Sequence, residues 1–224
     1  MAYYIDIEKI SIDDYCKKLA SAYLSPGRLI LKENLDERFG YFKSIGIENV
    51  KGLGQLLKKK DKFSELSNIE CLSAEYLTIL LREINSIHPK PNNLSDFVKI
   101  AKDTVFKLQE IGITNTQKLY ELVYTSADRQ KVADNAGVTD QEILQLAKLA
   151  DLSRIRWVGA TYAQLLFDIG ADTVEKVSKS SAVDLHVRIN QIIKGQNIFK
   201  GAIGLNDVKI LVEAAKELPF DIEF

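Results

Sequence analysis

The clearest hydrophobic pattern in the chain lies between Ile155 and Thr173. Apolar residues recur there at the spacing of one helix face, at Val158, Tyr162, Leu165, Leu166 and Ile169. Gly170 follows the last of them, and a glycine in that position is typical of a helix C-terminus. The pattern therefore predicts a short loop over residues 156–159, followed by one helix that ends before Gly170.

The same kind of helix end occurs elsewhere in the chain. A glycine is followed three positions later by an N-cap residue in three places, namely Gly46 and Asn49, Gly112 and Asn115, and Gly170 and Thr173. Ser73 follows Gly46 by 27 residues, and Thr139 follows Gly112 by 27 residues, each at the predicted start of a further helix. This repeated spacing favours an array of related helical units.

The array also predicts where tight bends precede helices. Counting back 12 residues from each of the three glycines, and adding a shorter fourth copy, gives four predicted helix-hairpin starts: Asn34-Leu35, Ile100-Ala101, Val158-Gly159 and Ile203-Gly204. Only the last two retain a hairpin glycine. We therefore expect the first two to serve packing alone.

Breaker residues divide the chain into segments. Ser11 and Asp14 predict the start of an early helix, which Pro26 and Gly27 bring to an end. Pro89 and Pro91 mark an extended connector. We expect an N-terminal arm and helix over 1–27, a first repeat unit over 28–92, the second to fourth units over 93–218, and a tail over 219–224. The tail either docks on the body or frays.

Two stretches carry a family resemblance. Trp157-Val158-Gly159, with Ala163 and Leu166, resembles the second half of a helix-hairpin-helix motif. In such motifs a tight hairpin and a helix N-terminus present backbone N–H groups to a nucleic-acid phosphate. The first hairpin residue is usually glycine, and here it is Trp157, which lacks the freedom of glycine to adopt a positive φ.

The order of elements from Pro26 to Leu218 resembles an uncharacterised bacterial family of tandem helix-hairpin-helix proteins. The resemblance rests on Arg28-Leu29-Ile30-Leu31, on Tyr76 to Ser86, on Pro89-Lys90-Pro91 and on Leu152-Ser153-Arg154-Ile155-Arg156. It implies an all-α fold of tandem helix-hairpin-helix (SAM-like) repeats with a short N-terminal appendage.

Composition narrows the possible partners and compartment. The 224 residues include 30 Lys and Arg against 31 Asp and Glu, which argues against a strong unassisted grip on DNA. No signal peptide pattern and no membrane-length apolar run occur in the sequence. Cys16 and Cys71 lack metal-type spacing, so we expect reduced core thiols in a cytoplasmic protein that does not contact a membrane.

The sequence offers little chemistry for catalysis. His88 and His186 have no cysteine, histidine or carboxylate partner at a useful spacing. Gly52-Leu53-Gly54 lacks the rest of a nucleotide-binding loop, so we expect two glycines inside a helix. We therefore predict a protein that is not an enzyme, with no catalytic residue, no bound metal and no cofactor.

Binding remains as the expected activity. We predict contact with the backbone phosphates of duplex DNA, without sequence preference, at Arg154, Arg156, Trp157, Val158, Gly159, Ala160, Lys200, Gly201, Ile203 and Gly204. Trp157 either stacks on a base or fills the core, and the basic run Lys58–Lys62 is either a solvated helix end or a phosphate-contacting patch. The alternative is a helical scaffold or adaptor that binds an unknown protein partner. Balanced charge favours the adaptor, and the motif favours nucleic acid.

Overall fold

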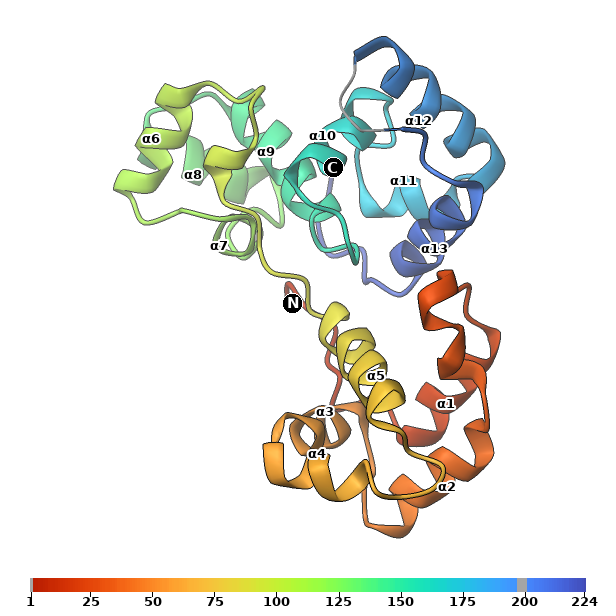
Figure 1. The fold of residues 1–224 in the computed structure, drawn as a ribbon. Coiled ribbons are helices and arrows are strands. Elements are labelled where there is room, and N and C mark those ends of the chain that lie inside the picture. Colours follow the sequence, from red (N-terminus) through yellow and green to blue (C-terminus); the bar gives the residue numbers. More distant parts are fainter. Residues whose placement is uncertain (1, 197–200) are drawn as a thin grey trace. The chain divides into compact units, whose positions relative to one another are not determined.

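The computed structural model describes residues 2–196 and 201–224. These residues form helices and loops with no β-strand, and their only strand-like pairings are two isolated bridges (Figure 1). The all-α prediction is therefore confirmed. The chain divides into two compact units, residues 6–88 and the first five residues together with residues 89–224.

The unit over residues 6–88 is built from six short helices. They are α1 (Ile12–Ser21), the 3-10 helix η1 (Pro26–Lys32), α2 (Leu35–Ser44), α3 (Val50–Lys58), α4 (Lys60–Leu66) and α5 (Ala74–Ser86). The helix α1 packs on α2 and η1, while α5 packs on α3, α4 and η1. Buried Arg38 joins these elements, because its guanidinium donates to the carbonyls of Ile30 and Cys71, both at 2.8 Å.

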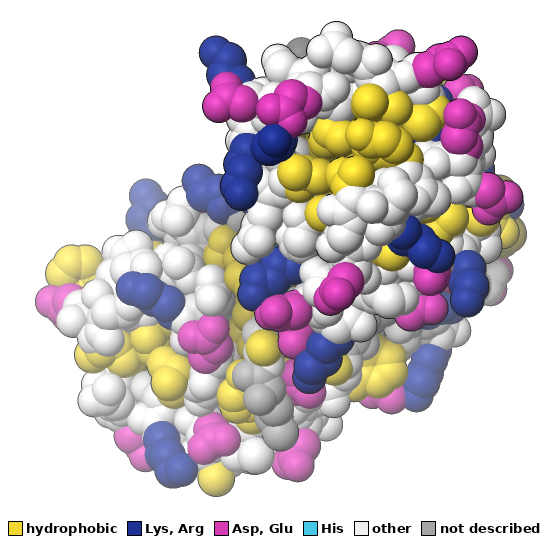
Figure 2. All heavy atoms as spheres, turned by 90° about the horizontal axis from the view of Figure 1, so that it is seen from below, with side chains coloured by type: hydrophobic (Ala, Val, Ile, Leu, Met, Phe, Trp, Pro, Cys, Tyr) yellow, Lys and Arg dark blue, Asp and Glu magenta, His cyan; other side chains and the backbone are white. Residues whose placement is uncertain are grey.

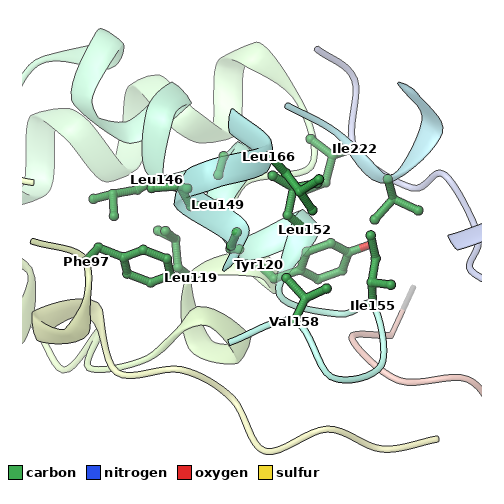
Figure 3. Close-up of a cluster of buried hydrophobic side chains, with 14 of the residues drawn as sticks. Phe97, Leu119, Tyr120, Leu146, Leu149, Leu152, Ile155, Val158, Leu166 and Ile222 are labelled. Carbon is green, nitrogen blue, oxygen red and sulfur yellow. The ribbon is translucent and has the colours of Figure 1, made fainter. Parts of the chain in front are cut away.

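The larger unit contains the remaining helices. They are η2 (Leu94–Asp96), α6 (Lys102–Glu110), α7 (Thr116–Tyr120), α8 (Ser126–Ala136), α9 (Asp140–Leu152), α10 (Ala160–Asp168), α11 (Val174–Lys179), α12 (Ala182–Gln196) and α13 (Leu205–Lys216). The helix α9 packs on α7, α8 and α10, and α13 packs on α11 and α12. Figure 3 shows part of the core, where Val158 and Ile222 join Leu152 and Leu166 in one apolar cluster.

The predicted helix ends are present. Gly46, Gly112 and Gly170 have φ of 82°, 86° and 75°, the left-handed conformation that closes a helix. In each case the next residue donates its N–H back to the last helical turn: Ile47 to Phe42 O (3.0 Å), Ile113 to Leu108 O (2.9 Å) and Ala171 to Leu166 O (3.0 Å). Asn49, Asn115 and Thr173 then cap the following helices through their side chains.

The two units share local geometry at matched positions. The starts of α3 and α7, of α4 and α8, and of α5 and α9 are each separated by 66 residues (50 to 116, 60 to 126 and 74 to 140). The isolated bridges also correspond, because Ser11 pairs with Asn49 and Asn93 pairs with Asn115. Each bridge therefore pairs the N-cap residue of a corresponding helix, which is α3 in one unit and α7 in the other.

The structure also tests the predictions made for the tail, for the glycines at 52 and 54 and for the two cysteines. The tail docks on the body, since Ile222 is buried and the Glu223 N–H donates to Tyr124 O at 2.9 Å. Gly54 lies inside α3, where an added Cβ would come within 3.1 Å of Ile84. The expectation of core thiols is wrong in part, because Cys16 and Cys71 are free but only partly buried.

Candidate nucleic-acid interface

The bend before α10 is a tight turn centred on Trp157. The Val158 N–H donates to Ile155 O at 3.1 Å, and Trp157 has φ of 65°. A left-handed backbone is unusual for a large side chain. Val158 is buried, and its carbonyl accepts a hydrogen bond from Asn92 Nδ2 at 3.3 Å. Packing and this bond therefore hold the bend in a conformation that glycine would adopt more easily.

The helix that follows the bend begins without a cap. Gly159 occupies the N-cap position of α10 and offers no side chain, and no acidic residue lies in the first turn. Within the described ranges, α10 is the only α-helix that has neither a capping side chain nor an acidic residue in its first turn. Gly159, Ala160 and Thr161 donate their N–H groups to no acceptor in the described part of the chain. These donors, with the helix dipole, form a local positive end.

Trp157 lies at the surface of this bend rather than in the core. Its side chain is 43 % exposed. The guanidinium carbon of Arg156 lies 5.0 Å from the centre of its ring. The structure therefore excludes the core-filling role and leaves ring surface beside the open end of α10.

Arg154 is a structural residue, and its predicted contact with phosphate is wrong. The residue is 1 % exposed, so no ligand can reach it. Its guanidinium pairs with Asp151 at 2.8 Å and donates to the carbonyls of Tyr3 and Pro219, both at 3.1 Å. It also lies 4.4 Å from the centre of the Tyr120 ring. Arg154 therefore joins both ends of the chain to α9.

Asp151, the partner of Arg154, was not among the predicted residues. It lies three positions before Arg154 near the end of α9, and its second oxygen accepts the Val174 N–H at 2.8 Å. Burial raises the pKa of the Asp151 carboxyl, while the charge of Arg154 opposes that rise. A carboxylate three residues before an arginine was the available signal, although this spacing is common on solvated helices.

Arg156 is less accessible to a ligand than its sequence position suggests. Its side chain is only 10 % exposed and pairs with Glu217 at 3.3 Å. Lys99 lines a pocket with Ala160 and Thr161, and it pairs with Asp168 at the C-terminal end of α10 at 2.7 Å. Both of these cations are therefore already paired within the protein.

The bend before α13 differs at the position that would receive a phosphate. Gly201 has φ of 106°, and Asn190 bonds both backbone groups of Ile203, at 2.9 and 3.0 Å. The Gly204 N–H donates to the Asp207 carboxylate at 3.3 Å. A carboxylate from the chain therefore occupies this helix end, and the prediction of an open amide at Gly204 is corrected. Lys200 lies outside the described residues.

The face that Figure 2 displays has no large basic region. Lys and Arg side chains are interspersed there with Asp and Glu, between patches of hydrophobic side chains. The run Lys58–Lys62 spans the end of α3 and the start of α4, and Lys62 pairs with Glu65 at 2.6 Å.

In the part of the chain that is described, no group of three or more His, Cys, Asp or Glu side chains could hold a metal ion. The described helices include none with the length and apolar character needed to cross a membrane.

Comparison with known proteins gives one finding. A family model described as "Domain of unknown function (DUF4332)" matches residues 98–218, which is more than half of the chain. The matched region runs from α6 to α13 and includes both bends. No curated protein and no solved structure matches the chain.

Proposed function

The chain belongs to the family described as a domain of unknown function (DUF4332), and we propose that it is a non-catalytic binding protein that contacts nucleic-acid backbone phosphate. The contact is made at the bend before α10, by the amide N–H groups of Gly159, Ala160 and Thr161. A phosphate bound there is recognised by charge and hydrogen bonds, so the contact carries no sequence preference.

The observation that supports this proposal is the uncapped N-terminus of α10. A helix end with free N–H groups and no acidic side chain attracts an anion. The half-exposed Trp157 lies directly before it and offers a ring on which a base can stack. The strained φ of Trp157 is consistent with a functional role, since such strain is concentrated at binding sites.

We further propose that α9, the bend and α10 form one helix-hairpin-helix unit. The two helices pack against each other, and Val158 fixes the bend between them in the core. The segments that end at Gly46 and Gly112 would be related units in tandem, because they have the same helix-end geometry. Their bends lack the open helix end, since α2 and α6 both carry acidic residues in the first turn.

Fluorescence anisotropy with labelled oligonucleotides tests this function. We expect weak binding with a slope of log K against log salt of roughly −1 to −2, because few phosphates are contacted. Duplexes of unrelated sequence should bind alike, and a single strand tests for stacking on Trp157. Absence of binding at low salt would remove the proposal.

A second candidate function, a helical adaptor for another protein, is favoured by a different observation. Val98 is 90 % exposed and Phe106 is 58 % exposed, and both border an apolar groove on the larger unit. Exposed apolar surface of this kind marks binding sites for other proteins. An adaptor would retain its partner after nuclease treatment, whereas a nucleic-acid-mediated association would be lost.

A further inference from the structure

The groove on the larger unit lies between the loop after η2 and the helix α6. It has a volume of about 510 Å³. The residues that line it are Ser95, Phe97, Val98, Ile100, Lys102, Val105, Phe106 and Gln109. Phe97 and Val105 form a buried floor, and Val98 and Phe106 stand exposed beside it. The groove therefore offers apolar surface to a side chain from outside.

The corresponding face in the other unit can be identified from the helix ends. The glycines that follow α2 and α6, Gly46 and Gly112, are 66 residues apart (46 to 112) and have the same geometry. Groove residues on α6 therefore correspond to residues of α2 as follows: Lys102 to Asp36, Val105 to Phe39, Phe106 to Gly40 and Gln109 to Lys43.

In the unit over residues 6–88, α1 packs on part of this face. The Tyr15 ring of α1 lies 6.2 Å from the Phe39 ring of α2. Asp13 of α1 pairs with Lys43 of α2 at 2.8 Å. Phe39 and Lys43, which match Val105 and Gln109 of the groove, therefore contact a packed helix, whereas Gly40, which matches Phe106, has open space beside it.

Among its described residues, the larger unit contains no equivalent of α1. Ser11 and Asn93 occupy the same place, because each forms the isolated bridge with the N-cap asparagine of its unit. From Ser11 to Asn49 the chain runs 38 residues (11 to 49), but from Asn93 to Asn115 only 22 (93 to 115). The shorter segment holds η2 where the longer one holds α1 and η1. The segment from Asn93 to Asn115, which builds the groove, thus contains no helix that covers it.

We propose that the groove binds an amphipathic helix of a partner protein, in the position that α1 takes on α2. The helix should present large apolar side chains with the spacing of Ile12, Tyr15 and Leu19, the buried positions of α1. It needs no counterpart of Asp13, because α6 has Gln109 where α2 has Lys43. This inference rests on the adaptor function and is independent of the phosphate contact.

A titration monitored by NMR tests the groove directly. The full-length protein, labelled with ¹⁵N, is titrated with a helix-stabilised synthetic peptide that has the sequence of residues 11–22. We expect saturable shifts in the amides of Val105, Phe106 and Gln109. Phe106→Ser should weaken binding by roughly tenfold, because a large apolar side chain is lost from the contact. Leu122→Ser removes a side chain of similar exposure that does not line the groove, and it should have no effect.

Three outcomes would overturn the inference. One is no binding at peptide concentrations of about 1 mM, which corresponds to negligible affinity. Another is a set of shifts confined to residues 6–88, and the third is equal binding by the Phe106→Ser variant. If a nuclease-resistant partner binds wild-type and Phe106→Ser protein equally, the groove is excluded while the adaptor function stands. Duplex binding by Phe106→Ser should equal that of the wild type, which separates this test from the phosphate contact.

Discussion

The bends before α10 and α13 have similar sequences but opposite chemistry at the helix end. Each places a branched apolar residue and a glycine before the helix, Val158-Gly159 in one and Ile203-Gly204 in the other. In each, an asparagine side chain bonds the carbonyl of the apolar residue, at 3.3 Å for Val158 and 3.0 Å for Ile203. The backbone frame is therefore supported in the same way.

The difference arises at the third residue of each helix. Asp207 takes that position in α13 and accepts the Gly204 N–H, whereas Tyr162 takes it in α10 and brings no carboxylate. The residue with a positive φ also differs. In the bend before α10 it is Trp157, two positions before Gly159, and in the bend before α13 it is Gly201, three positions before Gly204. The two bends thus share a sequence motif but differ at the helix N-terminus. The N-terminus of α10 is open, whereas the Asp207 carboxylate occupies that of α13 with the negative charge that a phosphate would bring.

The largest expected effect concerns Arg154, which flanks the open bend. Arg154→Met should lower the free energy of unfolding by about 3–5 kcal/mol, because Asp151 would remain buried and unpaired. Urea unfolding followed by circular dichroism measures this loss. Arg156→Met is the matched control and should cost under about 1 kcal/mol, since its pair with Glu217 is less buried. Similar losses in both variants would mean that Arg154 is not the structural residue described.

Thr161→Asp places a carboxylate in the first turn of α10, one position before Tyr162, which matches Asp207 of α13. A carboxylate in the first turn competes with phosphate, so we expect duplex affinity to fall by roughly tenfold. The same charge should stabilise the helix by about 0.3–1 kcal/mol, which separates lost binding from unfolding. Thr161→Ser is the control, and anisotropy and thermal melts measure both quantities. Unchanged affinity in Thr161→Asp would contradict phosphate binding at the open end of α10.

Trp157 allows a test of strain within the open bend. Trp157→Gly relieves the positive φ, whereas Trp157→Ala removes the same ring and keeps the strain. The glycine variant should therefore be more stable than the alanine variant by about 1 kcal/mol. Both should lose base stacking and keep the salt slope of the wild type. Equal stability of the two variants would show that the left-handed conformation carries no strain.

Asp207→Asn should have the smallest effect. It weakens the bond that closes the α13 end and makes that end more like α10. We expect a loss of under about 1 kcal/mol in stability and a gain of about twofold in duplex affinity, because a second helix end opens. Calorimetry and anisotropy measure the two changes. A drop in affinity would assign Asp207 a supporting role in binding instead.

Local rules predicted much of the fold. The glycine that ends each helix and the Asn or Thr three positions later depend only on neighbouring residues, and these caps occur where the sequence placed them. The bend at Val158-Gly159 was predictable for the same reason. The conformation of Trp157 was not, because local preference opposes it and core packing of Val158 supports it.

The role of each charged residue depends on distant parts of the chain. Arg154 is buried by carbonyls from Tyr3, 151 residues away, and from Pro219, 65 residues away. No pattern around residue 154 indicates that both termini pass there. The Asp207 contact was local and could have been foreseen from the spacing of a first-turn acid.

A single NMR titration compares the two helix ends as phosphate sites. Protein labelled with ¹⁵N is titrated with a short DNA duplex at low salt, and the backbone amide shifts are followed. We predict saturable shifts at Gly159, Ala160 and Thr161, and no shift at Gly204, because its N–H already donates to Asp207. Equal shifts at Gly204, or none at the three amides of α10, would contradict it.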